Sequence, residues 1–297
     1  MPQDHAARGA LYALLCAAMF GFAGAVAGGV FDVVPPARVA QARSLMVVVL
    51  LVPFAIMRGS FKPQPGLWRV ALMGLNLALV TVTFYWAIDL LGVGPGATVQ
   101  FLGPIMVLAW FAVVRRQRVQ PVVWIAAVSA VIGVALVTRA WTLDGGDLLG
   151  IGAGLAAAVM FATYLIYGEF LAGTHNPLYI TTWGFIFSSV IWLVVLPIWS
   201  FPTDIGGAAW RDLVVIGIVG TALPFVLEFR ALALVSSSIV GVLATAEPAI
   251  GAAFASVMLD QRLTPIQWVG VATVVISVAA VQRFGLGDAL PPVPVVS

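Results

Sequence analysis

Four charged side chains interrupt apolar runs that are long enough to cross a lipid bilayer: Arg43, Asp89, Glu228 and Glu247. A charged group at the bilayer centre costs at least ~2.5 kcal/mol, and such residues in membrane helices usually face a cavity or one another. A carboxylate at that depth can bind an ammonium group or carry a proton, and a guanidinium can bind a carboxylate. These four residues are therefore the first candidates for a functional site.

Glu247 stands near the middle of its apolar run and directly before a proline. Pro248 leaves the Ala244 carbonyl without its helical partner, and Pro104 does the same to the Gln100 carbonyl in an earlier run. Two such kinked helices would expose carbonyl oxygens at the bilayer midplane, a set of acceptors that suits an ammonium group. The alternative is that neighbouring helices satisfy the kinks and that Glu247 completes a structural hydrogen-bond network.

Glu228 follows a third proline, Pro224, by one helical turn. Pro224 frees the Gly220 carbonyl in the same way. A carboxyl group at this depth loses the hydration that favours its charged form, so Glu228 is a candidate for a proton-coupling acid. The alternative is an interfacial carboxylate paired with Arg230 or with a cation from the first half of the chain. A pair with Arg230 is disfavoured, because residues two apart point to different helix faces.

Arg43 and Asp89 are predicted at similar depths in two neighbouring spans. They can form a gate-like pair in which Asp89 takes part in coupling, or Arg43 can bind the carboxylate of a zwitterionic substrate while an acid binds its ammonium group. A static ion pair between two helices explains them equally well. Glu169 and His175 come at the end of another span, and we expect them to face the solvated headgroup region.

Four aromatic residues lie deep enough to line a cavity, although packing in the protein core is the more common role of such residues. They are Tyr85, Trp86, Phe101 and Tyr164.

Composition excludes most other classes of protein. The chain is 62% hydrophobic and only 9% charged, far from the roughly 25% charged residues of a soluble domain. The net charge of +2 is spread over short loops, so no basic stripe for nucleic acid is expected. Two histidines and one cysteine give no metal-ligand spacing, and no nucleophile elbow, nucleotide-binding domain or cofactor motif is recognisable. We expect an integral membrane protein without a metal or cofactor.

The two halves of the chain repeat one pattern. Residues 85–139 align without a gap to residues 229–283 at an offset of 144. The matched positions include Gln117, Arg118, Pro121 and Trp124, which recur as Gln261, Arg262, Pro265 and Trp268. Further upstream, at an offset of 141, Gly9, Ala17, Met19 and Phe20 match Gly150, Ala158, Met160 and Phe161. Internal duplication in an apolar chain is typical of secondary transporters.

The elements that position these residues are ten apolar runs, each near the roughly 20 residues that a spanning helix needs. The predicted spans are 9–29, 37–57, 67–90, 95–114, 121–139, 148–171, 177–199, 211–233, 237–259 and 264–283. Because five spans is an odd number, the second repeat must enter the membrane from the opposite side. The sequence thus predicts an all-α membrane protein with ten transmembrane helices as two inverted five-helix repeats, over residues 1–144 and 145–284, with a flexible tail at 285–297.

Charge indicates the orientation of the chain. With the amino terminus inside, nine of the fourteen basic residues fall on the cytoplasmic side. The basic loop at residues 115–118 has a neutral repeat partner at 259–262 on the other side. The positive-inside rule therefore predicts that both termini are cytoplasmic.

With the two repeats established, the chain resembles the drug/metabolite transporter superfamily with two EamA-type repeats. Its motifs are most similar to the threonine/homoserine exporter branch. They are the stretches 220–232 (GTALPFVLEFRAL), 246–249 (AEPA) and 262–267 (RLTPIQ), together with Phe84-Tyr85 and the stretch 100–104 (QFLGP). This chain departs from the branch at Gln100, where the resemblance implies an acid, so a carboxylate role is not carried over to that position.

The resemblance implies an inner-membrane exporter of small polar metabolites, most plausibly amino acids such as threonine or homoserine, that works by alternating access and is driven by a proton or substrate gradient. Gln100 and the Pro104 and Pro248 kinks would supply polar contacts. An exporter of lipophilic cations or drugs with the same fold is the nearer alternative. A membrane-embedded enzyme acting on a lipid-linked substrate is a remote one, because it predicts acids clustered at one interface and these acids are scattered over several depths.

Overall fold

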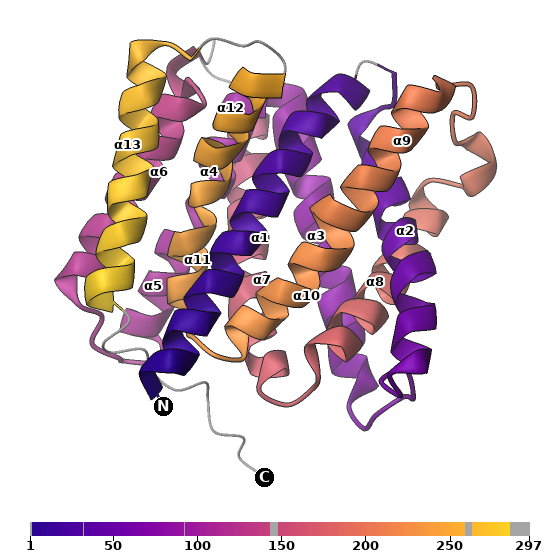
Figure 1. Ribbon diagram of the computed structural model, residues 1–297, viewed down its shortest axis with the longest axis horizontal. Helices are drawn as coiled ribbons and strands as arrows, with labels where there is room; N and C mark the ends of the chain where they lie inside the picture. The colour runs from indigo at the N-terminus through magenta and orange to yellow at the C-terminus, as the bar shows by residue number, and fades with distance from the viewer. Residues whose placement is uncertain (1, 32, 92, 143–147, 259–262, 286–297) are drawn as a thin grey trace.

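The structure is a computed structural model that describes residues 2–31, 33–91, 93–142, 148–258 and 263–285. Its described residues are almost entirely helical, and the helices stand side by side in one bundle (Figure 1). We call the end of the bundle at which α1 begins the N-terminal end, and the opposite end the far end. The predicted division at residue 144 and nearly all of the predicted tail 285–297 lie outside the described residues.

The described helices make ten crossings of the bundle, and three of these crossings are divided into shorter segments. The undivided crossings are α1 (Pro2–Val30), α2 (Pro36–Met57), α3 (Leu67–Leu91), α6 (Pro121–Val137), α7 (Leu148–Ala172), α8 (Pro177–Val195) and α13 (Pro265–Ala280). The divided ones are α4 (Val93–Gln100) with α5 (Gly103–Val113), α9 (Gly206–Gly217) with η3 (Ile218–Ala222) and α10 (Leu223–Leu232), and α11 (Ser237–Ala244) with α12 (Ala246–Met258). The remaining helical segments are the short 3-10 helices η1 (Ala140–Thr142) and η2 (Ile198–Ser200) and the π-helical segment η4 (Val281–Gly285), which continues α13.

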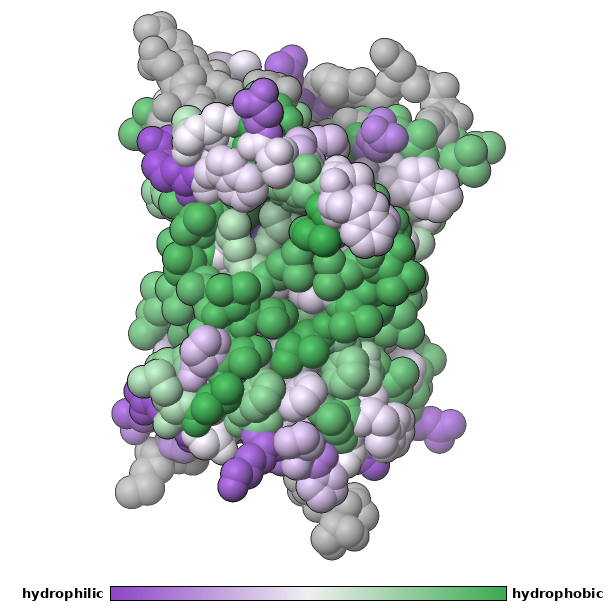
Figure 2. All heavy atoms as spheres, turned by 90° about the vertical axis from the view of Figure 1, so that its right-hand side faces the viewer, coloured by the Kyte–Doolittle hydropathy of each residue, from purple (hydrophilic) through white to green (hydrophobic). Residues whose placement is uncertain are grey.

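The surface and length of the bundle suit a membrane. Eight crossings are long and apolar enough to span a bilayer, and α6 and α13 are shorter apolar helices. Figure 2 shows an apolar band across the middle of one face, with polar residues gathered at both ends. Large apolar side chains are exposed on the helices; Val194 of α8, for example, is 77% exposed. The protein is therefore a multi-pass membrane protein built of two inverted five-helix repeats, as predicted.

Local sequence signals explain where several helices begin. Pro121 and Pro265, which are repeat partners, occupy the first turn of α6 and α13, where the missing proline N–H costs nothing. At α13 the Thr264 N–H also donates to the Gln267 Oε1 atom at 3.0 Å, half of a capping box. In contrast, α1 and α9 begin earlier than predicted, because hydropathy marks the bilayer core and not the full length of a helix.

The three divided crossings break beside the three predicted prolines. Pro104 lies in the first turn of α5, and Pro248 lies in the first turn of α12. Pro224 lies in the first turn of α10, directly after the π-helical segment η3. Each proline begins a new helical segment because its ring and missing N–H prevent the preceding segment from continuing regularly. All three breaks fall in the interior of the bundle, where they shape the cavity described below.

The two repeats interlock. Helix α3 of the first repeat packs along α7 of the second, and α6 packs along α13. In the second of these contacts Gly133 and Gly270 face each other so closely that a Cβ on Gly270 would lie 2.8 Å from the Gly133 carbonyl oxygen. Small residues at such crossings let two membrane helices approach closely.

We expect Gly270→Ala to lower the stability of the protein by about 1–3 kcal/mol, because the added methyl group overpacks the crossing of α6 and α13. Thermal unfolding of the purified protein in detergent measures this effect. The matched control is Gly152→Ala in α7, where an added Cβ meets nothing within 4 Å. Equal melting temperatures for the two variants would show that the close approach is not needed.

Candidate functional site

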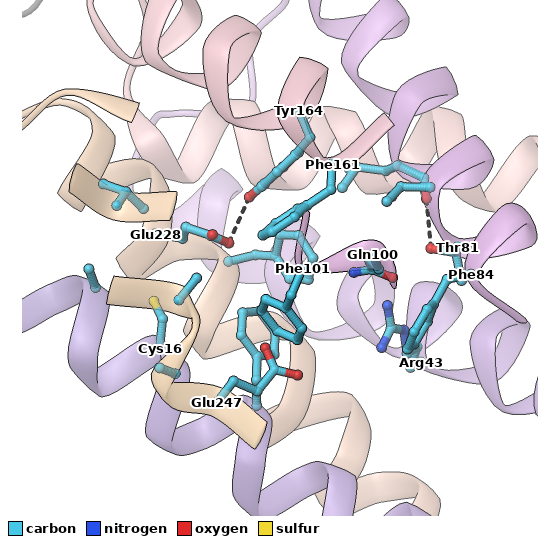
Figure 3. A pocket seen from close by; sticks show the side chains of 18 residues that line it. Cys16, Arg43, Thr81, Phe84, Gln100, Phe101, Phe161, Tyr164, Glu228 and Glu247 are labelled. Carbon is cyan, nitrogen blue, oxygen red and sulfur yellow. Dashed lines mark hydrogen bonds between the residues drawn. The ribbon is translucent and has the colours of Figure 1, made fainter. Parts of the chain in front are cut away.

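A cavity of about 120 Å³ lies at the centre of the bundle, between the two repeats (Figure 3). It is lined by side chains from α1 to α4 and from α7, α10, α11 and α12. Six of the predicted site residues line it: Arg43, Gln100, Phe101, Tyr164, Glu228 and Glu247. The cavity therefore gathers charges that are up to about 200 positions apart in the sequence.

A larger space of about 420 Å³ continues from this cavity to the far end of the bundle. Arg43, Gln100 and Glu247 line both spaces, so the two spaces adjoin at these side chains, and we refer to them together as the continuous cavity. The outer part is bounded by residues at the far ends of α6 and α13, such as Thr138 and Gln267. Among the described residues, the larger space is lined toward the far end, and no lining residue lies closer to the N-terminal end than those of the inner cavity. The continuous cavity therefore extends toward the far end.

Glu228 is buried on α10 and accepts a hydrogen bond from the Tyr164 hydroxyl on α7 at 2.8 Å. Tyr164 is 3% exposed and Glu228 is 4% exposed. Arg230 is exposed on another face of α10, so the alternative of an interfacial pair with Arg230 is not what the structure shows. The Glu228 carboxyl group instead accepts a hydrogen bond from the buried, neutral Tyr164 hydroxyl. This bond can form whether or not the carboxyl group is protonated.

The helix that carries Glu228 is widened one turn before it. In η3 the Thr221 hydroxyl donates to the Ile216 carbonyl oxygen at 2.9 Å, and the Leu223 N–H donates to the Ile218 carbonyl oxygen. The backbone bond spans five residues, the pattern of a π-bulge, which is frequent at functional sites. The Cys16 thiol on α1 donates to the Pro224 carbonyl oxygen at 2.9 Å, so the floor of the cavity below the bulge is fixed by α1.

Arg43 and Glu247 both line the cavity. Within the described part of the chain, neither side chain forms a hydrogen bond or a direct ion pair. Figure 3 shows the Arg43 guanidinium and the Glu247 carboxylate on different walls of the same cavity. An unpaired charge inside a membrane protein is costly unless it faces water or a ligand. The arrangement offers one cationic and one anionic contact to a bound molecule.

Gln100 adds a polar amide beside Arg43 (Figure 3). Its Oε1 atom is buried and has no hydrogen-bond partner among the described residues. A buried acceptor left unpaired costs about 1–3 kcal/mol, so this amide is a position where a bound molecule or a small movement of Arg43 can supply the missing donor.

Aromatic rings cover much of the remaining wall. Phe161 stacks on Tyr164 with ring centroids 6.4 Å apart, and Phe101 meets Phe161 edge to face at 6.1 Å. On the other side Phe20 packs edge to face on Phe225 at 5.3 Å. Phe101 comes from the first repeat and Tyr164 from the second. The rings leave a narrow site in which the polar side chains provide the hydrogen-bonding contacts.

Two predicted site residues lie elsewhere. Trp86 is 54% exposed and does not line the cavity, which corrects its predicted role, and the adjacent Tyr85 lines only the outer part of the volume. Asp89 is exposed near the far end of α3. Asp89 and Arg43 form no ion pair in the described structure, so the predicted gate-like pair is not present.

Glu169 is also placed differently from its prediction. It is 2% exposed instead of facing the headgroup region, and it accepts hydrogen bonds from the N–H and the hydroxyl of Ser237. His175 is half-buried and stacks on Tyr179 with ring centroids 5.4 Å apart. Glu169 was expected to be solvated because it lies near the end of a helix. Its partner Ser237 lies 68 positions away in the sequence, so no local pattern could predict the contact.

Two cavity residues that were not predicted could have been found from the internal repeat. Phe20 and Phe161 are repeat partners at the offset of 141, and both line the cavity. A matched aromatic pair in the first helix of each repeat is therefore a usable signal. Thr81 and Phe225 also line the cavity and have no comparable signature.

Comparisons with known proteins agree with this architecture. The EamA-like transporter family matches residues 7–139 and again residues 148–282. The threonine/homoserine exporter RhtA of Escherichia coli K12 is 28% identical over 208 residues, which is 68% of this chain and 66% of that exporter, just under two thirds of its length.

Two further matches cover nearly the whole chain. An uncharacterized inner membrane transporter of Salmonella typhimurium, YicL, is 24% identical over 291 residues, 93% of this chain and 95% of that protein. A solved crystal structure matches with a TM-score of 0.79 and 19% identity, over 92% of this chain and 97% of the other, a likeness that concerns the fold alone. The family match covers most of both halves, and the chain belongs to the EamA-like transporter family, a family of membrane transporters and not of enzymes.

Proposed function

We propose that this protein exports small zwitterionic metabolites, most plausibly amino acids of the threonine or homoserine type, across the inner membrane by alternating access. The observation that carries the proposal is the pair of unpartnered charges in one cavity, Arg43 and Glu247. Arg43 binds the carboxylate of the cargo and Glu247 binds its ammonium group. The 28% identity to a threonine/homoserine exporter supports the choice of cargo.

The inner membrane and the orientation of the chain are part of this proposal. A relative that covers nearly the whole chain is called an inner membrane transporter. Basic residues at the N-terminal end include those of the loop at 115–118, and the positive-inside rule then places both termini in the cytoplasm. In that orientation the continuous cavity extends toward the outside, so the structure corresponds to an outward-facing state.

Lipophilic cations are the second candidate cargo. The aromatic wall and the two carboxyl groups favour a cation, since aromatic faces attract positive charge. Arg43 argues against this candidate, because a free guanidinium in the same cavity repels a cation that carries no carboxylate.

Flux through purified protein tests the proposal. In lipid vesicles we expect counterflow of radiolabelled threonine or homoserine that a proton gradient accelerates, with no chemical change in the cargo. Flux of a lipophilic cation without amino-acid flux would replace the proposed cargo with the second candidate.

Coupling to protons is assigned to Glu228. We expect Glu228→Gln to lose the acceleration by a proton gradient while exchange of amino acid down its own gradient continues, because glutamine keeps an acceptor for Tyr164 but cannot take up or release a proton. The measurement is uptake with and without an imposed gradient. Tyr164→Phe is the control that removes the same hydrogen bond and keeps the acid. Gradient-driven uptake by Glu228→Gln at the rate of the unaltered protein would remove Glu228 from the coupling mechanism.

A further inference from the structure

The N-terminal end of the cavity is closed by a buried carboxylate that the proposed binding and coupling steps do not use. The Glu169 Oε2 atom, at the end of α7, accepts hydrogen bonds from the Ser237 N–H at 2.8 Å and from the Ser237 hydroxyl at 2.6 Å. The Arg115 Nη1 atom lies 3.8 Å from Glu169 Oε1. Glu169 is 2% exposed, and the Arg115 side chain is 26% exposed. We call Glu169, Ser237 and Arg115 the lock.

The lock lies just beyond the cavity on two helices that line it. On α7, Tyr164 lines the cavity and Glu169 follows five residues later toward the N-terminal end. On α11, Val240 lines the cavity and Ser237 precedes it by three residues in the same direction. At 1.5 Å per residue the lock is roughly 5–8 Å beyond these lining residues. A molecule leaving the cavity past Tyr164 and Val240 toward the N-terminal end would pass beside the lock.

Side chains fill the space between the cavity and the lock. Phe229 and Leu232 of α10 are fully buried there, and a Cβ on Gly168 of α7 would lie 2.9 Å from Leu232 Cδ1. A Cβ on Gly241 of α11 would lie 3.1 Å from Leu165 Cδ1. Helices α7, α10 and α11 are therefore in close contact, and the route at this end is shut by packing as well as by the lock.

Further bonds join the two repeats at the same end. The Tyr167 hydroxyl of α7 donates to the Arg69 carbonyl oxygen at 3.0 Å, and the Trp183 Nε1–H of α8 donates to the Phe61 carbonyl oxygen at 3.1 Å. Arg115 comes from the first repeat, whereas Glu169 and Ser237 come from the second. The lock thus belongs to an interface between repeats that must rearrange if the cavity is to open at this end.

The inverted repeat makes the lock one-sided. At the offsets of 141 and 144, the positions that match Glu169 and Ser237 are Gly28 and Val93. These residue types offer neither a carboxylate nor a hydroxyl. A symmetry-related closure of the far end would therefore lack this polar contact, and the lock favours the state that is closed at the N-terminal end.

We propose that Glu169, Ser237 and Arg115 form the inner gate of the transporter, which breaks when α7 and α11 separate and admits cytoplasmic cargo. Opening lets water reach the carboxylate, so the contact breaks without leaving a buried unpaired charge. The assignment of this end to the cytoplasm rests on the proposed function. The competing explanation is a static cap, in which Glu169 only satisfies the first N–H groups of α11.

Sidedness of thiol labelling separates these explanations. Cys16 is the only cysteine, so a Cys16→Ser background with Val240→Cys places one reactive thiol in the cavity next to the lock. A membrane-impermeant maleimide is applied to the face that carries the N-terminus, identified by a tag on that terminus. We expect Ser237→Ala and Glu169→Gln to raise the labelling rate from that face at least about tenfold, the population change that one lost charge-assisted hydrogen bond produces.

The matched control is Ser238→Ala, which removes a neighbouring hydroxyl that bonds to Ser236 and not to Glu169. We expect it to label like the parent protein. Equal labelling rates in Ser237→Ala and Ser238→Ala would overturn the gate, because a static cap changes stability without changing access. The labelling measurement needs no cargo. It therefore tests the gate even if the protein does not transport amino acids, and a negative result for one proposal leaves the other open.

A cross-link gives a second, independent measurement if the cavity cysteine prevents folding. In the Cys16→Ser background, Glu169→Cys and Ser237→Cys are joined by a short bifunctional thiol reagent that a reductant cleaves. We expect threonine counterflow through the cross-linked protein to stop and to return on reduction. Unchanged transport by the cross-linked protein would show that the contact does not need to open.

Discussion

Arg43→Gln is expected to reduce threonine counterflow by about 100-fold, because the carboxylate of the cargo loses its charged partner in the cavity. Truncating one partner of a buried charge pair costs 2–5 kcal/mol, and 1.4 kcal/mol corresponds to tenfold in affinity. Glutamine keeps hydrogen-bond donors but loses the charge and the bidentate geometry that suit a carboxylate. The substitution should therefore act on the affinity for the cargo.

Initial rates of counterflow over a range of threonine concentrations measure this loss. Arg211→Gln is the matched control, since Arg211 is an exposed arginine paired with Asp212 outside the cavity. We expect its rate to stay within about twofold, the range of an exposed ion pair. A loss of equal size in both variants would mean that Arg43 has no particular contact with the cargo.

Glu247→Gln is expected to reduce counterflow by a similar factor of about 100, because the ammonium group of the cargo then faces a neutral amide. Asp212→Asn is the control, a partly exposed acid outside the cavity that loses its charge by the same chemical change. Glu247→Asp should recover part of the rate, since it keeps the charge on a shorter side chain. Unaltered flux through Glu247→Gln would leave the structural hydrogen-bond network as the role of Glu247.

The double variant Arg43→Gln with Glu247→Gln distinguishes binding from mutual neutralisation. If both charges hold one cargo molecule, the double variant should transport more slowly than either single variant. If the two charges only neutralise each other, each single variant leaves an uncompensated charge and the double variant should recover. The comparison requires equal amounts of folded protein, which size-exclusion profiles in detergent establish.

The architecture could be predicted from the sequence because its causes are local or repeated. Apolar runs of spanning length fix the crossings, and the prolines Pro104, Pro224 and Pro248 lie where the structure divides a crossing. The offset between the halves fixed the two repeats, which the family match at residues 7–139 and 148–282 confirms. The depth of Arg43, Glu228 and Glu247 also followed from their positions within apolar runs.

The sequence does not predict which face of each helix turns toward the protein core and which toward lipid, because both surroundings are equally apolar. Trp86 and Tyr85 are neighbours in the sequence, yet only Tyr85 reaches the continuous cavity. In a water-soluble protein, the hydropathy of a residue indicates whether it is buried or exposed. In a membrane protein it does not, because helix packing decides which face is buried. Pairs such as Tyr164 with Glu228 and Ser237 with Glu169 join different helices, and a single sequence carries no signal for them.

Competition against radiolabelled threonine counterflow shows whether one cavity binds both the carboxylate and the ammonium group of its cargo. Unlabelled threonine is compared with its decarboxylated amine, its deaminated acid and a lipophilic cation. We predict that threonine competes strongly and that each analogue lacking one charge competes at least about 30-fold more weakly, the effect of leaving one charged contact unpaired. Competition by the amine or the lipophilic cation at the strength of threonine would contradict the account.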